Sequence, residues 1–216
     1  FTLALAVCLI AILSMGSVAW FSDADSVTNE FMIADSADTP DEIFSVDVWE
    51  NTPDGEKDQD GYEYTDILPG DTLKKEARVE NTGHYDQYVR VTVTISDAQA
   101  WIDALGANFS VADVFDGFVA ADWNHIWNNM NGATTIPENF VYVMYYKDIV
   151  KPGDVINVFN NVKIPTSLTR EEAVAFGGNF DITVKAEAVQ TENVVPEGTA
   201  AADAAWAAFK TVEGNN

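Results

Sequence analysis

Val89-Arg90-Val91-Thr92-Val93-Thr94-Ile95 decides the fold, because apolar and polar side chains alternate along it without a break. Successive side chains of a β-strand point to opposite faces, so this pattern predicts a strand with one buried and one solvated face. The same period of two appears where Leu73, Ala77 and Val79 alternate with charged residues. Further strands are expected at residues 44–48, 140–147, 155–164 and 180–189.

Turn sequences separate these segments. They are Pro53-Asp54-Gly55, Leu68-Pro69-Gly70-Asp71, Asn81-Thr82-Gly83 and Lys151-Pro152-Gly153-Asp154. Glycine tolerates a positive φ and proline presets φ, which is why both residues favour turns. Many short strands with such turns between them are typical of two packed sheets. The sequence therefore predicts an all-β protein with the architecture of a β-sandwich.

Helical patterns are fewer and short. Ser96-Asp97 precedes a segment that runs to Leu105, and Thr169 with Glu172 forms a capping box before residues 173–176. The alanine-rich residues 200–210 also favour a helix. Residues 111–130 carry apolar side chains at spacings near three and four, which predicts a helical excursion over one end of the sandwich. We expect a few helical insertions and a helical tail.

The charge balance limits the classes of function. The 216 residues include 35 Asp and Glu against 11 Lys and Arg, so the net charge is −24, while 47% of the residues are apolar. The apolar fraction is sufficient for a folded core. The charge excludes binding to nucleic acid, whose phosphates a protein must neutralise. The single cysteine, Cys8, excludes a disulfide framework and a cysteine-based zinc site.

Residues 1–19 have the composition of a secretory signal whose upstream part is missing. They contain no charged residue, and residues 3–13 are almost wholly apolar. Ser17 and Ala19 occupy the −3 and −1 positions that a signal peptidase requires, which predicts cleavage before Trp20 and secretion. An uncleaved membrane anchor is the alternative, because the apolar stretch that ends at Phe21 approaches the length that spans a bilayer.

A set of motifs in a fixed order resembles one protein family. The motifs are Ala19-Trp20-Phe21-Ser22-Asp23, Val27-Thr28-Asn29-Glu30-Phe31, Leu68-Pro69-Gly70-Asp71, Arg78-Val79-Glu80-Asn81-Thr82-Gly83, residues 142–152, residues 162–165 and residues 186–190. With them the chain resembles the TasA/CalY/camelysin proteins, which are secreted subunits of biofilm-matrix fibres. The resemblance implies a jelly-roll β-sandwich, processing by a dedicated signal peptidase, and fibres in which each subunit lends its N-terminal strand to a neighbour.

The residues after the expected cleavage site have the pattern of a detachable strand. Trp20 and Phe21 would begin the mature chain, a flexible polar stretch would follow, and Val27, Phe31 and Ile33 would share one strand face. Such a strand can bind the open sheet edge of another subunit by β-augmentation. The alternative is that residues 27–33 form the first strand of their own subunit.

The expected organisation follows from these segments. It comprises a signal segment at residues 1–19, a donor-strand segment at 20–35, a β-sandwich domain at 36–195 and an alanine-rich tail at 196–216. The expected partners are other copies of the chain in a homopolymer, the signal peptidase, and an accessory fibre or anchoring protein. The location would be the cell surface or extracellular matrix, with a transient membrane tether before cleavage.

An enzymatic function is not expected, although some members of the family have been described as metalloproteases. A common zinc protease needs two histidines one helical turn apart with a glutamate between them. The chain has only His84 and His125, and neither has a histidine at that spacing. No Gly-x-Ser-x-Gly motif is present either. A metal site that joins both histidines is the remaining enzymatic alternative.

A passive binding module is a third class of function. Residues 56–61 place oxygen donors at alternate positions before a glycine, as in a calcium loop, but Ile67 stands where a bidentate glutamate would be needed. We expect an acidic hairpin tip there, no cofactor, and at most weak binding of Ca²⁺. Trp101, Trp123 and Trp127 could stack on sugars in a carbohydrate-binding adhesin, although aromatic residues at helical spacing more often belong to a core.

Overall fold

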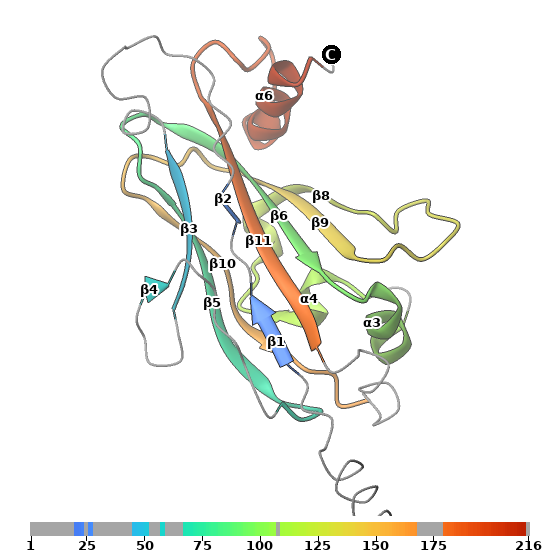
Figure 1. Cartoon of the computed structure of the whole chain (residues 1–216). Helices are drawn as coiled ribbons and strands as arrows, with labels where there is room; N and C mark the ends of the chain where they lie inside the picture. The colour runs from blue at the N-terminus through green and yellow to red at the C-terminus, as the bar shows by residue number, and fades with distance from the viewer. Residues whose placement is uncertain are drawn as a thin grey trace, which may run out of the picture.

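The structure, a computed structural model, describes residues 20–23, 26–27, 45–51, 57–58, 67–106, 109–167 and 179–214. These residues are mostly β-strand and form two sheets that share one core (Figure 1). Sheet A has the order β1 (Trp20–Asp23), β11 (Asn179–Gln190), β6 (Gln87–Ile95), β9 (Phe140–Tyr146) and β8 (Trp123–Asn128), and β2 (Ser26–Val27) also pairs with β11. Sheet B has the order β4 (Lys57–Asp58), β3 (Val46–Asn51), β5 (Thr72–Asn81), β10 (Val155–Lys163) and β7 (Phe115–Asp116). The predicted all-β sandwich is confirmed at this level.

The alternating residues 89–95 belong to β6, in the middle of sheet A. Val89, Val91, Val93 and Ile95 are each 0% exposed, whereas the residues between them are partly exposed. Burial of each such side chain contributes roughly 1.5–3 kcal/mol. A slip of one residue would turn all four outward, so the hydrophobic pattern fixes the register of β6 against β9 and β11.

Sheet B follows the same period with one exception. In β5, Ala77 and Val79 are buried against sheet A as their alternation predicts. Lys75 has the same parity as Leu73 and Ala77 and is only 3% exposed, so a lysine occupies an inward position within the apolar stripe. Burial lowers the pKa of its ammonium group well below the ordinary value. The inward face of β5 therefore carries a charged residue between Leu73 and Ala77.

The predicted helices have three different outcomes. Helix α3 (Ala98–Leu105) confirms the segment after Ser96-Asp97, although Asp97 has a φ of 58° and its side chain caps no backbone group. The predicted helix at 169–176 lies outside the described residues. In the tail, a short 3₁₀ helix, η2 (Ala201–Asp203), leads into α6 (Ala204–Val212). Phe209 of α6 packs against Tyr145 on the outer face of sheet A, with ring centroids 5.6 Å apart.

The predicted helical excursion at 111–130 is largely wrong. Only α4 (Val111–Val114) and a 3₁₀ turn, η1 (Ala120–Asp122), are helical, and the strands β7 and β8 occupy much of the rest. Gly117 has a φ of 79°, which a continuing helix does not allow, and an added Cβ would come within 2.2 Å of the Asn160 side chain. The spacing of Trp123 and Trp127 is even, so it also fits a strand.

Asn81 joins two of the predicted turns, and its replacement should be costly. The side chain is fully buried, and its Nδ2 donates to the carbonyl oxygens of Tyr85 and Val150, both at 2.8 Å, while Oδ1 accepts from the Gly83 amide at 3.0 Å. Asn81→Ala leaves these buried groups unpaired, at about 1–3 kcal/mol each. We expect a loss of about 3 kcal/mol of unfolding free energy, measured by urea denaturation.

The neighbouring Thr82 is a matched control for this prediction. Thr82 is exposed, and its hydroxyl shares one hydrogen bond of 2.7 Å with the Ser45 hydroxyl. Thr82→Ala should therefore cost less than about 1 kcal/mol, because the freed hydroxyl of Ser45 is open to water. Equal losses for Asn81→Ala and Thr82→Ala would contradict the role given to the buried amide.

Candidate functional site

The N-terminal strands β1 and β2 lie on the outer edge of β11. Both pair with β11 in parallel, whereas every other strand pairing among the described residues is antiparallel. The two strands share one register: Trp20 lies opposite Asn179, Phe21 opposite Phe180, and Val27 opposite Ala186. The backbone of β11 is therefore paired on one side by β6 and on the other by the start of the described chain.

This edge of sheet A adjoins sheet B. Strand β3 lies near both β2 and β11, and Figure 1 shows the short β2 between them. The N-terminal strands therefore lie along the seam where the two sheets meet. We call this position, the outer edge of β11 beside β3, the β11 slot.

The residues of β11 that face the core are buried while the slot is occupied. Phe180 is 4% exposed, Ile182 3%, and Val184 and Ala186 are 0% exposed. Phe180 also packs edge-on against Trp101 of α3, with ring centroids 4.9 Å apart. An empty slot would expose a row of unpaired backbone groups beside this apolar surface, which is a site for pairing with another chain. In the structure, β1 and β2 cover this edge.

The structure places only some of the predicted assembly residues. Trp20 and Phe21 are in β1 and Val27 ends β2, whereas Phe31, Ile33 and the cleavage positions Ser17 and Ala19 lie outside the described residues. The expected flexible stretch after Phe21 is wrong in part, because Ser22, Asp23 and Ser26 are in strands. Ladder hydrogen bonds use the backbone, so polar side chains do not prevent pairing. Within this single chain, β1 and β2 pair in cis.

The two histidines are in unrelated settings. His84 is exposed in the turn after β5. His125 is in β8, where its Nε2 lies 3.0 Å from Oδ1 of Asp203. No group of three or more His, Cys, Asp or Glu side chains suited to a metal occurs among the described residues. The absence of catalysis stays a prediction.

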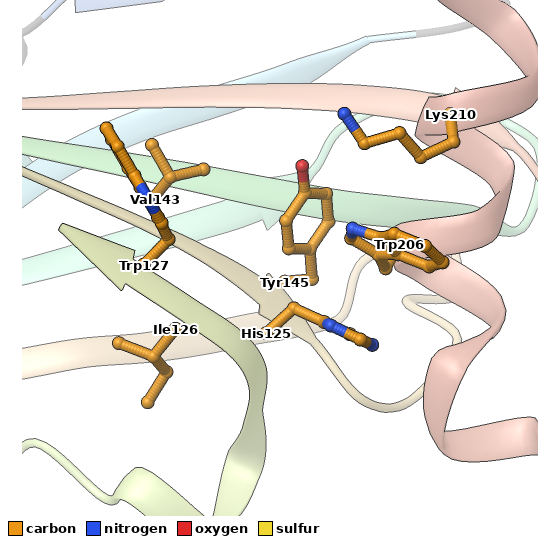
Figure 2. A pocket seen from close by; sticks show the side chains of 7 residues that line it. All are labelled: His125, Ile126, Trp127, Val143, Tyr145, Trp206 and Lys210. Atoms are coloured by element: carbon orange, nitrogen blue, oxygen red, sulfur yellow. The ribbon is translucent and has the colours of Figure 1, made fainter. Parts of the chain in front are cut away.

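The tryptophans proposed as sugar contacts separate into two kinds. Trp101 and Trp123 are 1% and 2% exposed, so both belong to the core and cannot stack on a sugar. Trp127 is 46% exposed and lines an open pocket with Trp206 of α6 (Figure 2). In the sequence, Trp206 is marked only as part of an alanine-rich tail. Trp206 follows Trp127 at a large distance along the chain, so no local pattern links them.

The expectations for residues 56–61 and for a membrane anchor are only partly covered by the described residues. Of residues 56–61, only Lys57 and Asp58 are described, as β4, so the expected acidic hairpin tip lies mostly outside the described residues. Across the part of the chain that the structure describes, every helix is too short or too polar to cross a bilayer.

Comparison with protein-family models, curated proteins and solved structures gives no match to this chain. A proposal for its function therefore depends on its own residues, on the β11 slot and on the motifs described above.

Proposed function

We propose that this chain is a structural subunit of extracellular biofilm-matrix fibres and that it polymerises by exchange of its N-terminal strand. The observation that carries the proposal is the single parallel register that β1 and β2 share on the edge of β11. The strands belong to the N-terminal end of the mature chain expected after cleavage, so they could occupy the β11 slot of another copy. The motif order that resembles the TasA/CalY/camelysin proteins supports the same function.

Exchange preserves the contacts that a single chain makes. Each copy has one N-terminal strand and one β11 slot, so pairing in trans replaces every cis pair by an equal one. The contact is head-to-tail, because the strand of one copy meets a different surface on the next, and such contacts produce open filaments when the rotation does not close a ring. Binding would follow the β-augmentation mode, in which backbone hydrogen bonds supply affinity and side-chain positions supply register.

The finer features of the proposal follow from the sequence. Removal of residues 1–19 by a signal peptidase would free Trp20 and release the tethered chain outside the cell. The proposal includes a jelly-roll topology. It is supported by the three connections from β5 to β6, from β9 to β10 and from β10 to β11, each of which joins one sheet to the other. An accessory or anchoring protein would occupy the unpaired slot at one end of a fibre.

Engineered disulfides distinguish pairing in trans from pairing in cis. Cys8 precedes the expected cleavage site, so the protein that begins at Trp20 contains no cysteine. Ser22 lies opposite Asp181 in the register, and residues opposite each other on paired strands are close enough for a disulfide. Ser22→Cys and Asp181→Cys, made in separate proteins and mixed, should give a covalent dimer on a non-reducing gel after mild oxidation.

The double variant and a displaced pair complete this test. Ser22→Cys/Asp181→Cys in one chain should give a covalent ladder if strands exchange and a cross-linked monomer if they do not. Ser22→Cys mixed with Thr183→Cys is the matched control, because Thr183 is two residues out of register and should not cross-link. A double variant that yields only intramolecular disulfides under conditions where the protein is concentrated would overturn the proposal.

A further inference from the structure

The outer face of sheet A has an open pocket, the aromatic pocket, whose cavity volume is about 490 Å³. Strands β8 and β9 and helix α6 contribute the side chains that line it: His125, Ile126, Trp127, Val143, Tyr145, Trp206 and Lys210. Figure 2 shows the ring of Tyr145 between the two tryptophans. Trp127 is 46% exposed and Trp206 36% exposed, so both indole rings present apolar surface to solvent. The volume of the pocket lies within the range of small-molecule sites, and its mainly aromatic and apolar lining is typical of them.

A β-bulge in β8 puts Trp127 on this outer face. Asn124 pairs with Tyr145, but Trp127 pairs with Val143, so β8 has one residue more than β9 between these two pairs. Without the extra residue, Trp127 would lie opposite Tyr142, which is 1% exposed and part of the core. Bulges redirect side chains in this way and occur often beside functional sites.

The bulge is held in place by the segment that begins α6. Asn124 Nδ2 donates to the carbonyl oxygen of Ala202 at 2.6 Å and to Oδ1 of Asp203 at 2.9 Å. The ring of His125 stacks on Trp206, with centroids 4.6 Å apart and planes at 17°. His125 has a φ of 47°, a conformation that a residue with a side chain keeps only when its surroundings enforce it. The wall of the pocket is therefore ordered before a ligand arrives.

The charges around the pocket select the class of ligand. The ammonium group of Lys210 lines the pocket and forms an ion pair with Glu213 at 3.5 Å. The Asp203 carboxylate stands beside the pocket, in contact with His125. A cationic ligand would meet Lys210, and the net charge of −24 would repel an anionic one. Because each charge already has a partner, a charged ligand would compete with an existing ion pair, whereas the hydroxyl groups of a neutral polyhydroxylated ligand can donate to Asp203 and accept from Lys210 without displacing either pair.

We propose that the aromatic pocket binds a sugar ring of a neutral glycan. The apolar C–H face of the ring packs on the indole of Trp127, and ring hydroxyls bind Lys210 and the pair formed by His125 and Asp203. This site uses no residue of β1 or β2, so it is independent of the proposed strand exchange. It would attach the protein to an uncharged polysaccharide whether or not the chain polymerises.

Calorimetric titration with neutral oligosaccharides tests the proposal. The protein that begins at Trp20 is titrated with maltohexaose, cellohexaose and chitohexaose, and we expect saturable binding of at least one. Trp127→Ala should weaken that binding at least tenfold, while Trp127→Phe, which keeps an aromatic ring, should weaken it less. Tyr85→Ala is the matched control, because Tyr85 is an exposed aromatic residue, 56% exposed, that does not line the pocket.

Circular dichroism confirms that each variant is folded before titration, and Trp127 is chosen because its exposed ring contributes little to the core. Four results would each overturn the proposal. They are no binding of any of the three sugars, binding that Trp127→Ala leaves unchanged, tighter binding of an acidic hexuronate oligomer than of the neutral ones, and self-association of the protein that Trp127→Ala abolishes while no sugar binds.

Discussion

Deletion of residues 20–33 from the protein that begins at Trp20 should abolish its filaments completely and leave a soluble monomer. The deletion removes β1, β2 and the remainder of the predicted donor segment, so the β11 slot of every copy stays empty and no copy has a strand to offer. Each lost ladder hydrogen bond costs about 0.5–1.5 kcal/mol. Negative-stain electron microscopy and sedimentation velocity measure the outcome.

A synthetic peptide of residues 20–33 shows whether the slot itself is responsible. Added to the deletion variant, it should bind, raise the thermal midpoint and still give no filaments, because a peptide offers no second slot. A peptide with Phe21→Asp and Val27→Asp should not bind, because both positions are in register with the buried residues Phe180 and Ala186. Filaments that form equally well from the deletion variant would refute strand exchange.

The central strands could be predicted from the sequence because their pattern is local. In β6 and β5, apolar residues recur at every second position, and this recurrence identifies the inward face. The predicted ends of these two strands differ from the observed ends by only a few residues. Lys75 escapes such a prediction, since a lysine between the inward residues Leu73 and Ala77 is not expected to be buried with them. Its burial depends on the opposite sheet and not on its neighbours in the chain.

The short elements could not be predicted for a related reason. Strand β7 has two residues, and β8 contains a bulge that changes the parity of its side chains midway. Trp123 and Trp127 consequently look equivalent in the sequence, although one is 2% and the other 46% exposed. Alternation is informative only while pairing is regular.

The candidate sites depend still more on tertiary structure. The pairing of residues 20–23 and 26–27 with β11 joins two segments that are far apart in the chain, and the sequence contains no pattern that specifies this partner. The aromatic pocket needs α6 to dock beside β8, and this contact depends on His125, Asp203 and Trp206. The sequence named three tryptophans as candidates for sugar binding, but it did not indicate that only Trp127 of the three would be exposed.

The docking of α6 leads to a second large expected effect, because one half-buried arginine, Arg90, links the helix to sheet A. Nε of Arg90 donates to Oε2 of Glu187 at 2.9 Å, and a second guanidinium nitrogen forms an ion pair with Glu213 after α6. The guanidinium carbon also lies 4.5 Å from the ring centroid of Phe209. Glu187 is 6% exposed, so its carboxylate depends on this contact and on Lys185, at 3.0 Å.

Arg90→Met should lower the free energy of unfolding at pH 7 by about 3 kcal/mol, because removal of one partner leaves a buried carboxylate poorly paired. Burial alone would raise the pKa of Glu213, but its hydrogen bond and attraction to Arg90 lower the pKa overall. A lowered carboxyl pKa stabilises the fold above the unfolded pKa and loses this effect as the pH falls through the folded value. The difference between wild type and Arg90→Met should therefore shrink as the pH is lowered from 7 toward 3.

Two further variants separate this explanation from a general loss of packing. Lys74→Met removes an exposed ion pair with Glu76, whose nitrogen and oxygen are 3.7 Å apart, and should cost less than about 1 kcal/mol. Arg90→Met/Glu187→Leu removes both charges of the pair and should recover much of the stability lost in Arg90→Met, because no unpaired carboxylate remains in the sheet. Urea denaturation at several pH values measures all three variants. If the double variant is as unstable as Arg90→Met at every pH, the arginine acts through its contact with Phe209, and charge pairing is not what fastens α6.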